Sequence, residues 1–316
     1  MLNGAAPVGL SPAPFYHEVA EGPAGVDAYW VRSADGTRLR MAVWPAGEKG
    51  TVVLFPGRTE YVEKYGRVAA DLATEGYGMV SFDWRGQGLA DRPQHRRDMG
   101  HVVSFSEYRE DVAAFRAAMD QLDLPGPVFM IAHSMGGAIG LRALYDGLTV
   151  QAAVFTGPMW GIQMQPVLKS LSPLVLGLAG PLGFGKSFAF TTGPHVPMEF
   201  DDNALTTDRD QFDYMARQTE RHPDLALGGP SNLWVKAAIA ETAALMQLPP
   251  PDVPTLTIVG TREKIVDVDA IDNRMKTWPG SRYLKIEGGE HEVMMESPAR
   301  RKQTMDAILD HLAANA

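Results

Sequence analysis

The chain contains no cysteine among its 316 residues. Disulfide frameworks, thiolate catalysis and zinc sites built on cysteine are therefore excluded. Residues 1–14 have neither a basic start nor an apolar core, so we expect no signal peptide and a cytoplasmic location. The longest apolar stretch, residues 166–185, is interrupted by Lys169, prolines and glycines, and we expect no transmembrane span.

The chain has fewer basic than acidic residues. Lysine and arginine number 29 against 38 acidic residues, which gives a net charge of −9 at pH 7. This balance argues against binding to nucleic acid and against electrostatic docking on anionic membranes, but it permits a neutral lipid or a small ester as substrate. Hydrophobic residues make up 45% of the chain and charged residues 21%, as in soluble globular proteins.

The stretch of residues 127–137 contains the candidate nucleophile. Five apolar residues from Val128 to Ala132 predict a buried strand, and residues 138–145 predict a helix directly after it. A serine at such a sharp strand-to-helix corner, here Ser134, is typical of a nucleophile elbow. The backbone N–H of Met135 then lies at a helix N-terminus, which favours an anionic oxygen. The alternative is that Ser134 only caps the helix.

Strands and helices alternate along most of the chain, which predicts an α/β fold with a mostly parallel sheet. The expected strands are residues 28–33, 37–44, 51–55, 78–82, 128–132, 150–155, 255–259 and 282–286. The expected helices are residues 63–75, 104–122, 138–145 and 269–276, and a last one from Pro298 onward. Residues 160–247 break the alternation and are rich in proline, glycine and methionine. We therefore expect a core of residues 1–159 and 248–316, with 160–247 as an inserted cap over the carboxyl edge of the sheet.

The candidate base and acid follow the last two expected strands. His291 comes after residues 282–286 and two glycines, which places it at the same sheet edge as Ser134. The order nucleophile, acid, histidine is that of α/β-hydrolases. Two acids follow residues 255–259. Glu263 is the preferred triad acid and Asp267 the alternative. The other interpretation of Glu263 is an ordinary surface ion pair.

A second oxyanion donor is expected after the third strand. Residues 56–58 read Pro-Gly-Arg, and the N–H of Arg58 would join that of Met135. Gly57 allows the backbone to approach closely. The alternative is an ordinary turn at the end of a strand.

These motifs resemble the α/β-hydrolase superfamily, and within it the monoacylglycerol lipase and bacterial lysophospholipase group. The matching stretches are residues 55–61, 83–91, 132–137 and 289–292. The resemblance implies an α/β-hydrolase fold with a helical cap after the sixth strand. It also implies a serine carboxylic-ester hydrolase that acts on single-acyl-chain lipids through an acyl-enzyme, without metal or cofactor. Pro56, Ala132 and Glu263 depart from the usual His, Gly and Asp of relatives.

Two further functions stay open, a soluble short-chain carboxylesterase and a non-catalytic ligand-binding homologue. Candidate substrate-binding residues at the start of the cap are Met159, Trp160, Met164 and Leu168. The alternative for these side chains is packing of the cap against the core. Contact of the cap with a membrane surface is expected to be transient at most.

Residues 180–187 match the phosphate-loop pattern G-x-x-x-x-G-K-S. Such a loop requires a strand before it and a long helix after it, so that backbone amides and the helix dipole hold the phosphates. Residues 188–194 are too short and too broken by Gly193 and Pro194 for that helix. We therefore do not expect nucleotide binding.

Overall fold

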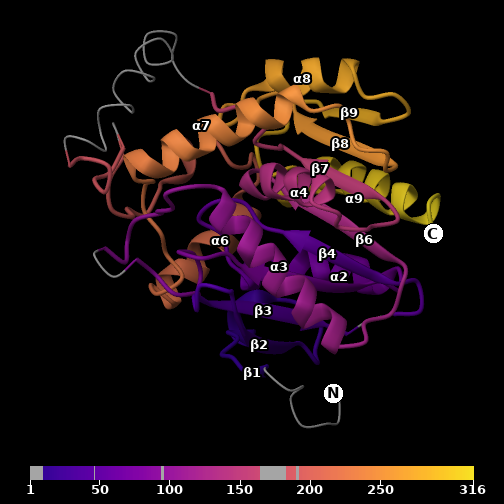
Figure 1. Cartoon of the computed structure of the whole chain (residues 1–316). Coiled ribbons are helices and arrows are strands. Elements are labelled where there is room, and N and C mark those ends of the chain that lie inside the picture. Colours follow the sequence, from indigo (N-terminus) through magenta and orange to yellow (C-terminus); the bar gives the residue numbers. More distant parts are fainter. Residues whose placement is uncertain (1–9, 46, 94–95, 164–182, 190–191) are drawn as a thin grey trace.

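The computed structural model describes residues 10–45, 47–93, 96–163, 183–189 and 192–316. These form a central sheet with helices on both faces (Figure 1). Within the described ranges the strand order is β1-β2-β3-β5-β4-β6-β7-β8-β9, with antiparallel pairing from β1 to β5 and parallel pairing from β5 to β9. The strands are β1 Ser11–Pro12, β2 Asp27–Arg32, β3 Arg38–Trp44, β4 Thr51–Phe55, β5 Gly78–Asp83, β6 Val128–His133, β7 Ala153–Thr156, β8 Thr255–Gly260 and β9 Arg282–Ile286. The expected mostly parallel sheet of an α/β fold is confirmed.

The central strands are apolar on both faces because helices cover both faces. Strands β4, β5, β7 and β8 are buried along their whole length. In the parallel part of the sheet, Phe55 of β4 is paired with Ala132 of β6, and His133 of β6 with Thr156 of β7. This register places the turns after β4, β6 and β7 next to one another at the carboxyl edge of the sheet.

The helices divide into two layers around the sheet. Buried apolar residues of α3, α4, α7 and α8 share one hydrophobic cluster, whereas those of α2 and α9 belong to the other. The helical elements are α1 His17–Ala20, η1 Val62–Tyr65, α2 Gly66–Thr74, α3 Ser106–Gln121, α4 Met135–Tyr145, η2 Phe200–Asp202, α6 Arg209–Arg221, α7 Asn232–Gln247, α8 Val268–Lys276, η3 Val293–Met295 and α9 Pro298–Ala313.

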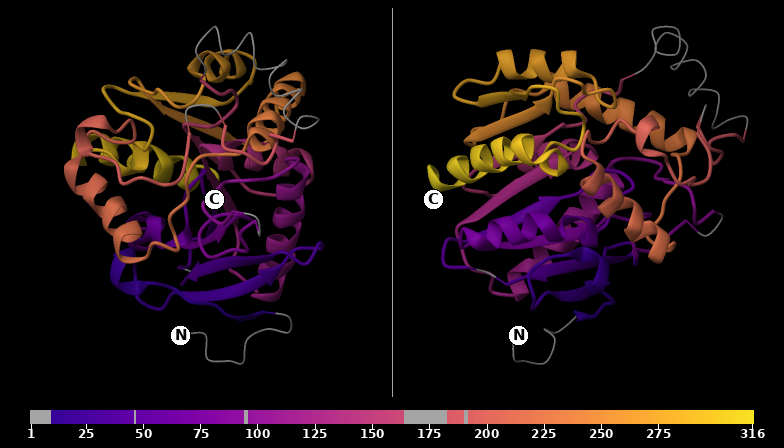
Figure 2. Two further views of the ribbon diagram at one scale, coloured as in Figure 1. Left: turned by 90° about the vertical axis from the view of Figure 1, so that its left-hand side faces the viewer. Right: turned by 180° about the vertical axis from the view of Figure 1, so that it is seen from behind.

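The segment between β7 and β8 contains helices α6 and α7, which lie on the same side of the molecule (Figure 2). It follows the sixth expected strand, which is β7 here because the two-residue strand β1 was not expected from the sequence. Helix α6 contacts the N-terminal region, where Tyr214 donates to the Ala20 carbonyl at 2.7 Å. In the described residues 183–189 and 192–199 no helix follows Lys186, as the sequence predicted. None of the helices in the described ranges is both long and apolar enough to cross a bilayer.

A fully buried ionic group joins β3, β5 and η1. The Arg40 guanidinium lies 2.7 Å from a carboxylate oxygen of Asp83 and 2.7 Å from one of Glu63, and all three side chains have no exposed surface. Breaking such a group by removing one partner leaves uncompensated buried charge.

We predict that Arg40→Met lowers the free energy of unfolding by about 3–5 kcal/mol, because two carboxylates lose their buried cation. Urea denaturation measures the loss. The control is Arg109→Met, which removes the ion pair with Asp146 from an arginine whose side chain is 53% exposed. That change should cost at most about 1 kcal/mol. Equal losses in the two variants would contradict the prediction.

Candidate active site

Ser134 occupies the corner between β6 and α4. Its φ of 51° and ψ of −119° lie in a region that non-glycine residues adopt only when the surrounding structure imposes it. Two backbone bonds impose it here. The N–H of Ser134 donates to the Thr156 carbonyl at 3.0 Å, and the N–H of Met159 donates to the Ser134 carbonyl at 2.8 Å. The predicted strand–turn–helix setting of this serine is therefore present.

The small residues around Ser134 allow neighbouring backbone to come close. A Cβ on Gly136 would collide with the carbonyl oxygens of Phe55 and Pro56 at the end of β4. A Cβ on Gly140 would lie 3.0 Å from the Cβ of Ala132. A larger residue at position 132 would meet α4, so alanine satisfies the same requirement as the usual glycine.

Glu263 and His291 form a buried acid–base pair. The Nδ1–H of His291 donates to Oε2 of Glu263 at 2.6 Å, and neither side chain is more than 4% exposed. The other carboxylate oxygen accepts the N–H groups of Ile265 at 2.7 Å and Val266 at 3.2 Å. Burial opposes ionisation of Glu263, but these hydrogen bonds, that from His291 first, outweigh it and lower the pKa of Glu263. With the proton held on Nδ1, Nε2 of His291 is left as a base.

Asp267, the alternative acid, has a different position. Its carboxylate caps the N-terminus of α8 by accepting the Ala270 N–H at 3.2 Å. An aspartate at this position satisfies a helix N–H that would otherwise lack a partner. The structure therefore pairs Glu263, and not Asp267, with His291.

The end of β7 brings the acid–base pair beside the serine. A Cβ on Gly157 would lie 3.2 Å from Nδ1 of His291 and 3.3 Å from Oε2 of Glu263, while the preceding Thr156 binds the Ser134 backbone. The rings of His133 and His291 are 4.8 Å apart between centroids. Within the described part of the chain the Ser134 hydroxyl makes no hydrogen bond. Such bonds in ligand-free active sites often tighten only when substrate is present.

The candidate oxyanion donors belong to two segments that adjoin the serine. Met135 is the first residue of α4, so its N–H has no acceptor within that helix. Gly57, which precedes Arg58, is close enough to Ser134 that an added Cβ would be 3.0 Å from the serine Cβ. The loop of residues 56–59 thus passes directly beside the nucleophile position. Thr59 in this loop has a positive φ of 65°.

Gln87 and Trp84 hold this loop in place, a role that the sequence did not reveal. The Gln87 amide donates to the Gly57 carbonyl at 3.0 Å and accepts the Thr59 N–H at 3.0 Å. The Trp84 indole N–H donates to the Pro56 carbonyl at 2.9 Å. Both side chains are buried and come from residues 83–91, the stretch that carries part of the family resemblance.

Two of the four predicted substrate-binding residues are described. Trp160 is 1% exposed, and its ring lies 5.1 Å from that of Phe155 and 5.9 Å from that of Trp278. Met159 is 6% exposed and touches the serine turn through its backbone. Met164 and Leu168 lie outside the described residues. Contact of these four residues with substrate stays a prediction.

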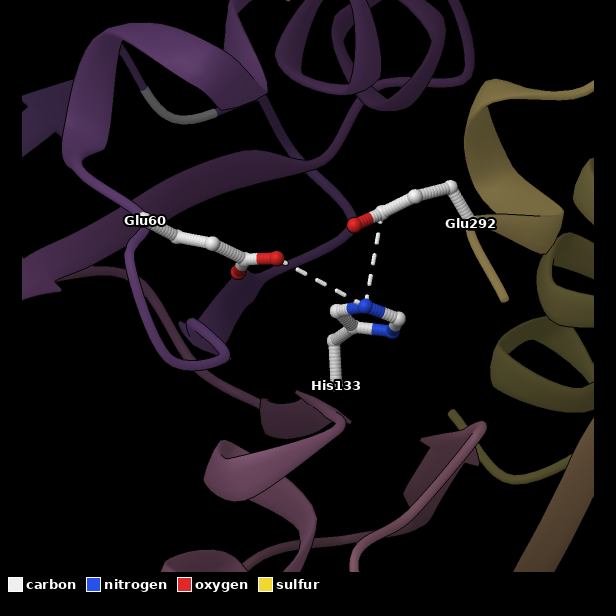
Figure 3. Close-up of side chains that lie close together, drawn as sticks. All are labelled: Glu60, His133 and Glu292. Atoms are coloured by element: carbon white, nitrogen blue, oxygen red, sulfur yellow. Dashed lines mark ion pairs between the residues drawn. The ribbon is translucent and has the colours of Figure 1, made fainter. Parts of the chain in front are cut away.

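One group of three described residues has the donor types of a metal site. Glu60, His133 and Glu292 are buried, and their ligand atoms lie within 4.8 Å of one another (Figure 3). The ammonium group of Lys64, however, lies 2.6 Å from Glu60 and 2.5 Å from Glu292. A cation of the protein itself, the Lys64 ammonium, already lies between the two carboxylates, so the group does not fit a metal ion.

The chain is similar to several known proteins. Residues 46–298 match the family described as serine aminopeptidase, S33. The chain belongs to this α/β-hydrolase family. Lysophospholipase L2 of Escherichia coli strain K12 is 33% identical over 273 residues, which cover 82% of this chain and 79% of that protein.

Solved structures of α/β-hydrolases share the fold. A soluble variant of monoglyceride lipase from Saccharomyces cerevisiae, in complex with a substrate analogue, has a TM-score of 0.69 at 18% identity and covers 90% of this chain and 94% of that one. A thermostable carboxyl esterase from Bacillus coagulans, in complex with glycerol, has a TM-score of 0.71 at 15% identity and covers 93% and 99%. The family match and the sequence relative, together with this shared fold, place the chain in the lipase group of the α/β-hydrolases, as its motifs indicated.

We predict that Glu263→Gln lowers kcat for an ester substrate by about 10³- to 10⁴-fold, because an amide cannot stabilise the charge that His291 gains during the reaction. Asp267→Asn is the matched control. Asparagine is also a good N-cap, so this variant should keep most of the activity. Steady-state kinetics compare the two, and the opposite ranking would move the role of the acid to Asp267.

Proposed function

We propose that this α/β-hydrolase is a serine carboxylic-ester hydrolase that acts on lipids with one acyl chain, of the lysophospholipid or monoacylglycerol type, through an acyl-enzyme. The observation that carries the proposal is the buried Glu263–His291 pair beside the strained turn at Ser134. Nucleophilic catalysis by serine needs a base that is itself oriented by a third group.

In the proposed mechanism Nε2 of His291 takes the proton of the Ser134 hydroxyl as its oxygen attacks the ester carbonyl. The carbonyl oxygen becomes an oxyanion and accepts hydrogen bonds from the N–H groups of Arg58 and Met135. Glu263 stabilises the imidazolium. The tetrahedral intermediate expels the alcohol, which leaves with the proton from His291, and the acyl group remains on Ser134. A water molecule, deprotonated by His291, then releases the carboxylic acid by the same route.

The lipid substrate is supported by the relatives and by the cap. The sequence relative from Escherichia coli is named a lysophospholipase, and it aligns with most of this chain. We propose residues 160–247, between β7 and β8, as a cap over the carboxyl edge of the sheet, where open α/β folds bind ligands. Such a cap would receive the acyl chain of the substrate.

We predict that a fluorophosphonate probe labels the wild-type protein and not Ser134→Ala, because the probe requires an activated serine. Ser106→Ala, at an exposed serine at the start of α3, is the control and should label like the wild type. In-gel fluorescence reads out the result. Wild-type protein that stays unlabelled would favour the non-catalytic binding homologue.

A series of esters with increasing acyl length tests the substrate class. We predict that kcat/KM rises from acetate to long acyl chains, since each additional buried CH₂ contributes about 0.8 kcal/mol of transfer free energy. The slope should be the same with glycerol and with a phosphodiester as head group if one apolar channel receives the chain. A maximum at acetate would contradict the lipid assignment and support a short-chain carboxylesterase.

A further inference from the structure

Four charged side chains are buried together next to the candidate active site. They are Glu60 after β4, Lys64 in η1, His133 at the end of β6, and Glu292 after His291, and none is more than 6% exposed. Figure 3 shows the ends of Glu60 and Glu292 directed at His133 from two different parts of the chain. We call these four residues the buried charge cluster.

Lys64 and His133 each lie between the same two carboxylates. The Lys64 ammonium is 2.6 Å from Oε1 of Glu60 and 2.5 Å from Oε1 of Glu292. Nε2 of His133 is 3.3 Å from Oε2 of Glu292 and 3.6 Å from Oε1 of Glu60. Glu60 also accepts a hydrogen bond from the Tyr65 hydroxyl.

The surroundings of His133 favour a positive charge on its ring. Its Nδ1 is 2.9 Å from the Thr156 carbonyl oxygen, which can only accept, so Nδ1 carries a proton. Its Nε2 faces the carboxylates of Glu60 and Glu292, which also only accept when ionised. Nε2 makes no hydrogen bond to either carboxylate within the described residues, but two carboxylates lie within 3.6 Å of it, and we infer that the ring is an imidazolium. Burial disfavours this charge, but the carboxylates of Glu292 and Glu60 outweigh burial and raise the pKa of His133.

The cluster is then electrically neutral, with two carboxylates, one ammonium and one imidazolium. Burial likewise opposes charge on Lys64 and Glu292. The carboxylates nevertheless raise the pKa of Lys64, and His133 and Lys64 hold the pKa of Glu292 well below its usual range. A neutral arrangement of this kind avoids leaving an uncompensated charge in the interior.

Each part of the cluster is attached to a different part of the candidate site. Glu60 accepts the backbone N–H of Gly57, the residue before the oxyanion donor Arg58. His133 directly precedes Ser134, and Glu292 directly follows His291. The charges therefore join three segments that are far apart in sequence. These are the loop of residues 56–59, the turn at Ser134 and the loop that carries His291.

We propose that Glu60, Lys64, His133 and Glu292 are positioning residues that hold these three segments in register and keep zero net charge beside the catalytic imidazole. The proposal rests on the proposed ester hydrolysis. The cluster touches no reacting atom itself. It acts through Gly57, Ser134 and His291.

The proposal predicts opposite changes in the pH dependence of two variants. Lys64→Met leaves a net negative charge in the cluster, which favours the protonated form of the catalytic imidazole. The acidic limb of kcat/KM against pH should then move up by about one pH unit. Glu60→Gln leaves a net positive charge and should move this limb down by a similar amount. In both variants kcat should fall by at least about tenfold while KM changes little, because the reacting groups are displaced.

Asp272→Asn is the matched control for the charge change. It removes one carboxylate from the ion pair between α8 and β9, in which Lys285 lies 2.9 Å from Asp272. This variant should leave the acidic limb and kcat where they are. If Lys64→Met and Glu60→Gln both shift the limb in one direction, or leave it unmoved, the electrostatic part of the proposal is wrong.

A second measurement does not depend on activity. In ¹⁵N-labelled wild-type protein, the ring of His133, assigned through the backbone of residues 132–134, should still carry protons on both nitrogens at a pH above the ordinary histidine pKa of about 6.5. A ring that carries a single proton at that pH would overturn the proposal. So would one equivalent of bound metal in the purified protein, because Lys64 would then not be the cation between the carboxylates.

These readouts separate the two proposals. Absence of esterase activity and of probe labelling at Ser134 would refute the proposed function, whereas the imidazolium state of His133 would still be measured directly. An active enzyme whose His133 is neutral would refute the cluster alone.

Discussion

The turn between β6 and α4 constrains how closely the ends of β4 and β7 must approach the candidate site. Ser134 adopts a backbone conformation that is costly for a residue with a side chain, and it persists because Thr156 and Met159 bind its N–H and carbonyl. These bonds require the end of β7 to lie directly against the turn. The end of β4 must also come close, which only glycine at position 136 permits. Close backbone approach at one sheet edge is therefore the constraint from which the geometry of the candidate site follows.

The buried charge cluster is the second constraint on the candidate site. Close backbone approach brings three loops together, but it does not by itself fix their relative positions. The buried charge cluster crosses between these loops, and its members lose their partners if any loop moves. Breaking one partner in such a group costs more free energy than the intact group contributes, so it acts on position more than on net stability. The Arg40 group plays the same part between β3, β5 and η1.

Much of the fold was visible in the sequence because its signals are local. Apolar runs such as residues 51–55 and 128–132 predicted buried strands, and both were confirmed as β4 and β6. The exception in the sheet is β1, which at two residues is too short to leave a pattern. The order and spacing of Ser134 and His291 relative to strand ends placed both at the correct edge. The choice between Glu263 and Asp267 needed coordinates, because both follow β8 within one loop.

The buried charge cluster could not have been predicted from local sequence patterns. Glu60 and Lys64 are four residues apart, a spacing that on a helix surface indicates an ordinary exposed ion pair. Their burial depends on His133 and Glu292, at sequence separations of up to 228 residues from Lys64. Gln87 is a similar case, since its two bonds to the loop of residues 57–59 bridge segments about 30 residues apart. Long-range polar contacts leave no periodic signal in a single sequence.

In the proposed mechanism one hydroxyl, one imidazole and two backbone N–H groups converge on a reacting carbonyl. A crystal structure of the protein after reaction with a long-chain fluorophosphonate tests it most directly. The account predicts phosphorus bonded to Oγ of Ser134, with the phosphonyl oxygen about 2.7–3.1 Å from the N–H groups of Arg58 and Met135. Phosphorus attached to another residue, or a phosphonyl oxygen directed away from both N–H groups, would contradict the account.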